Sequence, residues 1–512
     1  MGGSSNRAQC IREKVLIPRT SNLVSRSYKL IIVLGLLFCN AISAEPWIDT
    51  RDEFLRADIE ILADIGVIKV PISTYPLMWS GIIRDLDSVK SENIPMEYRA
   101  TYWRVKKAGR KSIGEDLRQL KFSLSDNENV IRTFGDSSRA KNELSARRAG
   151  MSRHFAWNAE LTYADDPIDG DDVRVDGSYI SSIFGNWIVT IGAVEKWWGP
   201  SWSSNNILSN NARPPVGLSF QRNYSDQADS SGLQWIGPWT FNAFVSELND
   251  ERGKANSKLI GASLTLKPIE SVEVGLRSTQ VSTEDKKVEA FDSSLDVALS
   301  NRICVSEMKI NPQECLRYFD ESSRQISGLD FRWKLPFQIP VALYGSSYSN
   351  SKLFSTNSIN QVGLTSSLKI GLTRVKWYMD VSDKKRFNET NNSLENSFTE
   401  LGFRYNNLSL GSTFDDFTSV VSLGLIATID KTNQISLHFT KGRDILHIPA
   451  FREGIENNSS SKRKSDLTAL KLIWKINTDK GGTFNISLES SDFESLVNRN
   501  EARIDWNYLL NN

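Results

Sequence analysis

Three tryptophans fall within six positions in the stretch Lys196–Trp202, which reads Lys-Trp-Trp-Gly-Pro-Ser-Trp. A second stretch, Ser209–Pro215, follows closely and is rich in Asn, Arg and Pro. Aromatic rings offer flat faces on which sugar rings stack, and Asn and Arg side chains supply hydrogen bonds that orient a polar ligand. The alternative is that the same rings pack a loop against the wall of the fold, as buried aromatic side chains commonly do.

The candidate residues for sugar binding form one set of stacking rings and hydrogen-bonding side chains. Arg side chains in this set would also pair with the carboxylates of an acidic polysaccharide. Within it we expect Trp197 and Trp198, which follow a strand, to be structural, and Trp202 and Arg213 to contact ligand. The full set is Trp197, Trp198, Trp202, Asn210, Asn211, Arg213, Arg222, Trp235 and Trp239.

The sequence contains no Gly-rich phosphate loop, no Gly-x-Ser-x-Gly motif and no His-Glu-x-x-His motif. Carboxylates do occur in pairs in turn-like segments, and we interpret them as solvated loop tips rather than the acid pair of a glycosidase. A Ca²⁺ site between Asp165 and Asp176 is the alternative there, although the EF-hand spacing is not met. The three His residues have no ligand spacing. We therefore predict no enzyme activity, no metal and no cofactor. The pairs are Asp165-Asp166, Asp171-Asp172 and Asp415-Asp416.

Charge is nearly balanced over the 512 residues, with 62 basic and 61 acidic side chains. The first 44 residues contain six of the basic side chains and one acidic one, so the remainder has 56 basic and 60 acidic side chains. A nucleic-acid-binding protein would need a strong basic excess or a basic stripe. The composition therefore argues against nucleic acid as a partner.

The N-terminal region has the pattern of a secretory signal. The apolar run Leu30–Phe38 is preceded by Arg26 and Lys29 and followed by small residues up to Ala44. It is too short to span a bilayer as a helix. We predict a Sec-type signal peptide over residues 1–44. Export exposes the remaining cysteines to an oxidising compartment, so we predict a disulfide between Cys304 and Cys315.

Two kinds of periodicity divide the exported chain. Residues 45–112 show the 3.6-residue period of three short helices, with Asp49 or Thr50 as the expected first cap and Gly66 as a stop. From about residue 115 the period becomes two, with polar turn residues between the alternating segments. We predict a small helical bundle over 45–112 and a β-domain over 113–512.

A closed barrel accounts for this many alternating segments, since it leaves no strand edge unpaired. In an outer-membrane barrel the apolar set faces lipid and the polar set faces the lumen. We therefore predict an all-β fold: a closed antiparallel transmembrane β-barrel of about 18 strands, at roughly 20 residues per strand and connection. Several soluble periplasmic β-domains are the alternative.

Several of these residues together resemble the Wzi-type capsule-assembly proteins, an outer-membrane family. The resemblance runs in order along the exported chain. It rests on the N-terminal region from Trp47 to Trp79, on Lys196–Pro200 with Asn210–Pro214, and on Gly237–Trp239 with Phe244.

That resemblance implies a barrel of about 18 strands with the helical bundle at its periplasmic mouth, in the outer membrane of a Gram-negative cell. It implies a lectin-like role, in which exported capsular polysaccharide or exopolysaccharide is bound and organised at the cell surface. The implied partners are that polysaccharide, outer-membrane lipid, the barrel-assembly machinery and the polysaccharide export complex. The alternative is a diffusion porin or a saccharide-specific channel.

Overall fold

The computed structural model describes most of the exported chain. The predicted signal peptide, residues 1–44, and the predicted Cys304–Cys315 disulfide lie outside the described residues. The described ranges are 45–114, 117–129, 131–165, 167, 169–227, 233–248, 257–282, 324–337, 339–349, 358–371, 373–383, 403–406, 408–414, 417–445, 466–478, 481–493 and 497–510.

Three helices follow one another near the start of the described chain, as the period predicts: α2 (Glu53–Asp64), α3 (Trp79–Ser88) and α4 (Met96–Gly114). The cap of α2 is Asp52 rather than Asp49 or Thr50; its carboxylate accepts hydrogen bonds from the amides of Phe54 and Leu55 at 3.0 and 3.1 Å. Gly66 follows the helix with φ of +82°, a conformation that favours glycine. Shorter elements here are β1 (Trp47–Ile48), β2 (Thr74–Tyr75), β3 (Leu77–Met78) and the 3₁₀ turn η1 (Ser91–Asn93).

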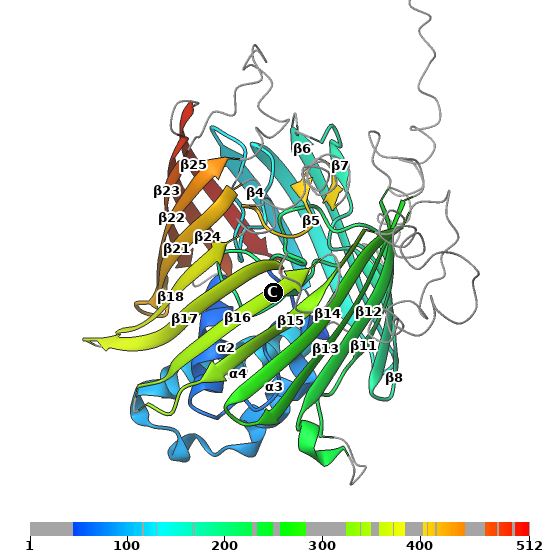
Figure 1. Ribbon diagram of the computed structural model, residues 1–512, viewed down its shortest axis with the longest axis vertical. Helices are drawn as coiled ribbons and strands as arrows, with labels where there is room; N and C mark the ends of the chain where they lie inside the picture. The colour runs from blue at the N-terminus through cyan, green and yellow to red at the C-terminus, as the bar shows by residue number, and fades with distance from the viewer. Residues whose placement is uncertain are drawn as a thin grey trace, which may run out of the picture. The chain divides into compact units, whose positions relative to one another are not determined.

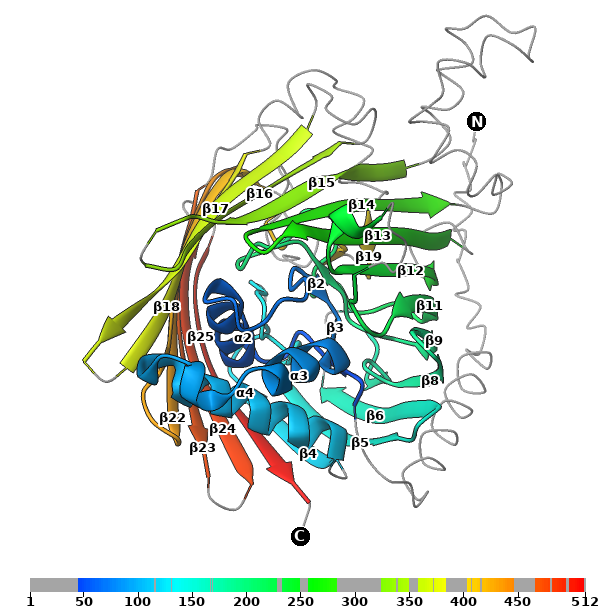
Figure 2. The same cartoon turned by 90° about the horizontal axis from the view of Figure 1, so that it is seen from below.

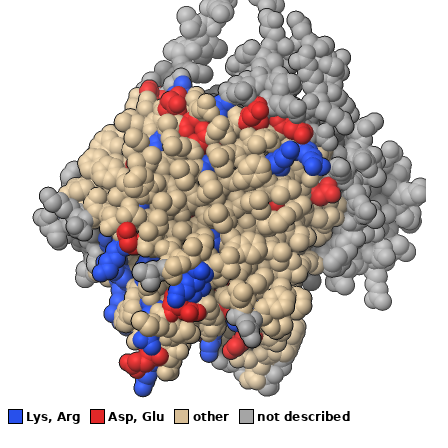
Figure 3. Space-filling model, turned by 90° about the vertical axis from the view of Figure 1, so that its left-hand side faces the viewer, with Lys and Arg blue, Asp and Glu red and all other residues tan. Residues whose placement is uncertain are grey.

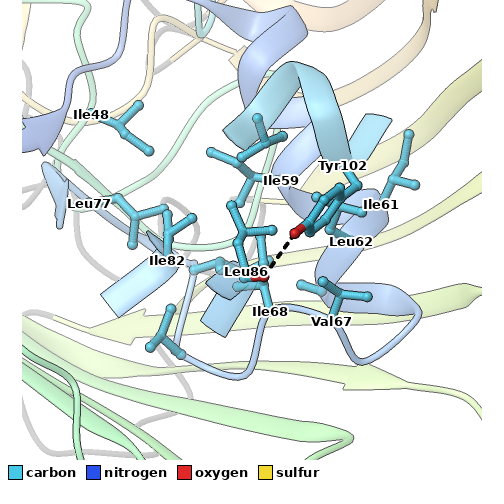
Figure 4. Close-up of a cluster of buried hydrophobic side chains, with 14 of the residues drawn as sticks. Ile48, Ile59, Ile61, Leu62, Val67, Ile68, Leu77, Ile82, Leu86 and Tyr102 are labelled. Carbon is cyan, nitrogen blue, oxygen red and sulfur yellow. Dashed lines mark hydrogen bonds between the residues drawn. The ribbon is translucent and has the colours of Figure 1, made fainter. Parts of the chain in front are cut away.

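The helices pack on one another through an apolar core. Ile59 and Leu62 of α2, Ile82 and Leu86 of α3 and Tyr102 of α4 are all buried in it (Figure 4). The Tyr102 hydroxyl donates a hydrogen bond to the carbonyl of Leu86 at 3.0 Å, which joins α4 to the last turn of α3 (Figure 4). A bundle this small needs a larger surface to dock on.

The rest of the described chain forms a closed antiparallel barrel (Figures 1 and 2). The short β7 and β8 pair with different parts of β6 and together occupy one strand position. The wall therefore has 18 strand positions, as predicted. The last wall strand closes the barrel on the first, β25 on β4. The wall strands are β4 Leu117–Ser125, β5 Asn142–Met151, β6 Phe155–Asp165, β7 Val173–Arg174, β8 Tyr179–Phe184, β9 Trp187–Gly192, β11 Gly217–Arg222, β12 Trp239–Leu248, β13 Ser257–Ile269, β14 Val272–Ser282, β15 Arg324–Lys334, β16 Val341–Ser349, β17 Ser358–Ile370, β18 Thr373–Asp383, β21 Phe417–Thr428, β22 Asn433–Ile445, β23 Leu467–Asn477, β24 Gly482–Phe493 and β25 Val497–Leu509.

Alternation along the strands separates an apolar outside from a polar inside. In β13 the side chains of Ser263 and Thr265 are buried inside, while Leu264 between them lies on the outer surface. The outer face shown in Figure 3 is mostly uncharged, and its Lys, Arg, Asp and Glu residues gather towards two opposite edges. Such a band is what a lipid-facing surface requires. Among the described residues, no helix has the length and apolarity to cross a membrane.

The two ends of the barrel differ. At one end most connections are short, such as 185–186 and 270–271, with 223–238 as a longer one, and α2, α3 and α4 lie at this end (Figures 1 and 2). At the other end they are long, such as 126–141 and 193–216. Near the short-turn end the wall strands carry several tryptophans, a residue that is enriched where a membrane protein crosses the membrane–water interface. These are Trp187, Trp239, Trp333, Trp474 and Trp506.

Candidate functional site

The Trp-rich stretch lies inside the barrel. Residues 193–216 leave the wall after β9 and return to it at β11, yet the wall is continuous beneath them because Gly192 pairs with Gly217. Inside, the segment forms β10 (Trp197–Trp198), which pairs with β2 of the N-terminal region. The stretch is therefore an inward-folded connection between neighbouring strands, and it ties the wall to the helical region.

Trp197 and Trp198 are both completely buried. The indole Nε1 of Trp197 donates to the Ser201 carbonyl at 3.1 Å, and the ring meets Phe134 edge-on, with centroids 5.3 Å apart. Trp198 points to the other side and packs against Phe244 of β12 at 5.4 Å. Opposite-facing neighbours of one short strand thus fill the space between the helical region and the wall, in the structural role expected for them.

Trp202 is also buried, 2% exposed, although ligand contact was expected for it. One ring face stacks on Tyr378 of β18, with centroids 5.5 Å apart and planes 11° apart. The Arg56 guanidinium carbon lies 4.1 Å from the ring centroid, and the indole Nε1 donates to Glu60 at 3.1 Å. Stacking of a sugar on Trp202 would require these neighbours to move.

Arg56 of α2 is the centre of this arrangement, and the sequence analysis did not select it. Its Nε donates to Glu60 at 3.1 Å, and its Nη2 donates to the carbonyls of Pro200 and Ser201, both at 2.9 Å. The available signal was the spacing of Arg56, Glu60 and Asp64, which puts three charges on one face of a helix. The guanidinium lies within 6 Å of four ring centroids, those of Trp202, Phe134, Trp197 and Tyr75.

On the wall, Asp380 of β18 anchors the same segment. Its carboxylate accepts hydrogen bonds from the amides of Trp202 and Ser203 at 3.1 and 2.8 Å, and from the hydroxyls of Ser201 and Ser203 at 2.8 and 2.7 Å. The Tyr344 hydroxyl donates a further short hydrogen bond. One buried carboxylate therefore fixes three consecutive residues of the segment, and charge-assisted hydrogen bonds of this kind are among the stronger ones.

Asn210 and Asn211 join this segment to other inward-folded connections. Their Nδ2 groups donate to the carbonyls of Thr133 at 3.0 Å and Ser409 at 2.9 Å, respectively. In return, Arg139 donates to the carbonyls of Asn210 and Asn211 at 3.0 and 2.8 Å. Both amide side chains therefore have structural partners.

Arg213 is held by three carboxylates from the connections on either side of β7. It donates to Asp176 at 2.8 Å, to Asp169 at 2.9 Å and to Asp171 at 2.8 Å. Burial alone would lower the pKa of Arg213, but the carboxylates raise it well above its usual range. All three aspartates lie in the range that the sequence analysis considered for a Ca²⁺ site, and Asp171 belongs to a pair interpreted there as a solvated tip. In the structure all three are partly buried around this guanidinium.

Arg222, Trp235 and Trp239 lie elsewhere, at the short-turn end of the barrel. The Arg222 guanidinium carbon is 3.8 Å from the ring centroid of Trp239, and its Nη1 donates to the Trp239 carbonyl at 2.7 Å. Trp235, in the turn η2 (Gln234–Ile236), is 68% exposed. The structure therefore groups six of the nine predicted residues inside the barrel and separates these three from them.

A pocket opens beside the inward segment, towards the long-connection end. It is a small space, and part of it is open to solvent. Two of the predicted residues, Asn210 and Arg213, line it. Phe244 and Leu259 of the wall and Leu410 of another inward connection complete its apolar side.

Lys196 lines the same pocket and was not among the predicted residues. Its Nζ donates to the Val194 carbonyl at 3.1 Å and lies 4.4 Å from the ring centroid of Phe244. Burial lowers the pKa of this lysine to about 8. Among the described residues no carboxylate forms an ion pair with it.

The barrel is closed and 18-stranded, has an apolar outer band, and is filled by its own connections. These features define an outer-membrane β-barrel rather than a soluble β-protein. The family model of the capsule assembly protein Wzi matches residues 118–504. The chain belongs to the Wzi family of outer-membrane capsule assembly proteins.

Individual relatives agree with this assignment. An uncharacterized 55.8 kDa protein in the cps region of Klebsiella pneumoniae is 24% identical over 372 residues, which cover 70% of this chain and 69% of that protein. Among solved structures, the Escherichia coli outer-membrane protein Wzi, described as a carbohydrate-binding β-barrel involved in group 1 capsule assembly, gives a TM-score of 0.74. It is 20% identical, and the match covers 91% of this chain and 99% of that one, so the likeness shows a common fold.

Proposed function

We propose that this barrel binds exported capsular polysaccharide at its long-connection end and holds it on the cell surface. The observation that carries the proposal is the interior: α2 and the inward segment 193–216 occupy the space that a porin leaves to water. A pocket with polar and apolar sides lies on the long-connection side of that filling. The relation to Wzi, which is described as carbohydrate-binding, supports the same ligand class.

The direction of the barrel in the membrane follows from its connections. Outer-membrane barrels have short turns on the periplasmic side and longer loops outside. The helical bundle, at the short-turn end, is then periplasmic, and the pocket side faces outward. In this proposal the bundle closes the periplasmic mouth, and the barrel binds polysaccharide at its extracellular end. The signal peptide over residues 1–44, the Cys304–Cys315 bridge and the protein partners in assembly and export stay predictions.

Two measurements test the proposal against the channel alternative. In a planar bilayer the wild-type barrel is expected to pass little current, whereas a diffusion porin or a saccharide channel conducts. In cells from which the gene is deleted, polysaccharide is expected to move from the cell-bound fraction to the medium, and the wild-type gene restores retention. An open, steady conductance together with unchanged retention in the deletion strain would reject a tether and favour a channel.

The same preparation tests the prediction that the protein is not an enzyme. Purified barrel incubated with the strain's own capsular polysaccharide is expected to leave its chain-length distribution unchanged. A shortened distribution that is absent from a heat-unfolded sample would assign a hydrolase activity instead.

A further inference from the structure

The pocket beside the inward segment contains three ionisable side chains: Glu195, Lys196 and Arg213. Two of them have partners of opposite charge. Glu195 accepts a hydrogen bond from Thr50 and has two guanidinium groups 3.9 Å away, and Arg213 is held by three aspartates. Lys196 has a backbone carbonyl and an aromatic face but, within the described part of the chain, no carboxylate.

Burying an ammonium group in a partly apolar pocket costs free energy, and proteins usually offset this cost by placing a carboxylate beside it. Nearby cations in this region are paired with carboxylates, since Arg213 alone contacts three aspartates. A ligand carboxylate would complete the pairing at Lys196. A lysine presents a mobile point charge, which suits a carboxylate carried on a flexible chain.

Other groups on the pocket wall indicate what the rest of such a ligand looks like. Asn210 uses its Nδ2 on Thr133, and its Oδ1 is buried with no hydrogen-bond partner, which leaves an acceptor for a hydroxyl donor. Phe244, Pro214 and Pro215 supply an apolar side. A cation, a hydrogen-bond acceptor and an apolar surface together match the carboxylate-bearing edge of one sugar ring, with the rest of the ring at the open mouth of this small pocket.

We propose that this pocket is a subsite for an acidic sugar, with the carboxylate of a uronic-acid-type residue on Lys196 Nζ and a hydroxyl of the same ring donated to Asn210 Oδ1. The inference rests on the proposed function, because it names the sugar class that the bound polysaccharide must contain. It differs from the prediction made from the sequence, in which the guanidinium of Arg213 was expected to take the carboxylate. Arg213 is already saturated by the three aspartates.

The test uses the full exported barrel in detergent and two forms of one probe. The probe is capsular polysaccharide purified from the strain that carries this protein, either native or with its carboxyl groups chemically reduced to alcohols. The proteins are wild type, Lys196→Gln, Lys196→Arg and Lys141→Gln. Lys141 is a matched control because it is exposed and also belongs to a long connection, 126–141, but does not line the pocket. Heat-modifiable gel migration checks that each barrel is folded.

Wild type and the Lys141→Gln control are expected to bind the native polymer about tenfold more tightly than the reduced one, a ratio typical of one charge-assisted contact. Lys196→Gln is expected to lose that ratio by weakening native binding alone, and Lys196→Arg to keep most of it. Equal binding of both polymers by wild type, or an undiminished ratio in Lys196→Gln, would overturn the subsite and leave the proposed function standing. Binding of neither polymer would overturn both. If Lys196→Gln does not fold, the wild-type ratio and the Lys196→Arg variant still decide the matter.

Discussion

The inward segment has two parts that differ in whether their charged groups have partners. From Trp197 to Ser203 it is closed off from solvent. Its three indoles are buried, the Arg56 guanidinium donates to the carbonyls of Pro200 and Ser201, and the Asp380 carboxylate accepts from the amides of Trp202 and Ser203. At Lys196 and from Ser209 to Pro215 it lines a pocket, where no carboxylate of the described residues pairs with the Lys196 ammonium. The Trp-rich motif and the proposed ligand pocket are therefore separate parts of one segment. The tryptophans hold the segment in position, and the pocket uses the residues beside them.

The sealed part is tested most strongly at Arg56. Its replacement by Ala removes the donor to two carbonyls and leaves Glu60 buried without that partner. Loss of one member of a buried charged network costs about 3–5 kcal/mol. We expect a marked fall in the temperature at which the folded gel band disappears, together with increased bilayer conductance. Arg99→Ala on the exposed side of α4 is the control, and an unchanged melting temperature for Arg56→Ala would contradict the anchoring role.

The next largest effect is expected at Trp202. Trp202→Ala leaves a cavity between Arg56 and Tyr378, and large-to-small changes of this kind cost about 3 kcal/mol or more. Polysaccharide affinity should change little, because the ring does not line the pocket. Measuring both quantities on the same preparation separates the structural role from the stacking role. Weakened polysaccharide binding with an unchanged melting temperature would assign Trp202 to the ligand after all.

The pocket part is tested by pH. A carboxylate ligand binds the ammonium form of Lys196, whose pKa in the empty pocket is about 8. Affinity for the native polymer should therefore be nearly constant below pH 7 and fall about fivefold by pH 9, where about one lysine in ten is still protonated and the neutral form binds about tenfold more weakly. Burial raises the pKa of Glu195 and lowers that of Arg213, but paired guanidinium groups and aspartates reverse both shifts, so neither group titrates in this interval. Lys196→Arg should abolish the decline, and a decline that persists in that variant would exclude Lys196 as its source.

The smallest effect is expected at Trp235, which the sequence analysis grouped with the site. Its side chain is exposed in the turn η2 at the short-turn end. Surface substitutions away from packed features change stability by about 0.5 kcal/mol or less. Trp235→Ala should therefore alter neither the melting temperature nor polysaccharide binding. Loss of binding in this variant would mean that ligand is met at both ends of the barrel.

Much of the fold could be predicted from the sequence, because its two periods are strong. Alternation over strands such as Ser257–Ile269 identified the wall, and Gly66 marked the end of α2 correctly. The cap of α2 was wrong by at least two residues, since Asp49, Thr50 and Asp52 all have oxygen-bearing side chains able to cap a helix.

The site was harder to predict, because its key contacts join distant residues. Arg56 meets carbonyls 144 and 145 positions away, and Asp380 meets Trp202 across 178 positions. Spacing in the sequence carries no signal for such pairs. Proximity in sequence was also misleading for Trp239. It follows the motif in the chain, but its strand starts at the opposite end of the barrel from the pocket. Lys196 belongs to the Trp-rich motif, but only the structure shows that no carboxylate of the described residues pairs with it.

The pairing of Gly192 with Gly217 has a consequence for how such a protein can change over evolutionary time. Because β9 and β11 are already register partners, residues 193–216 are an insertion that the wall does not need for its own continuity. Most of the pocket lining comes from this insertion and from Leu410 on another connection. Lineages that alter their surface polymer can therefore exchange the lining, residue by residue or as a whole loop, while the membrane-embedded frame stays constant.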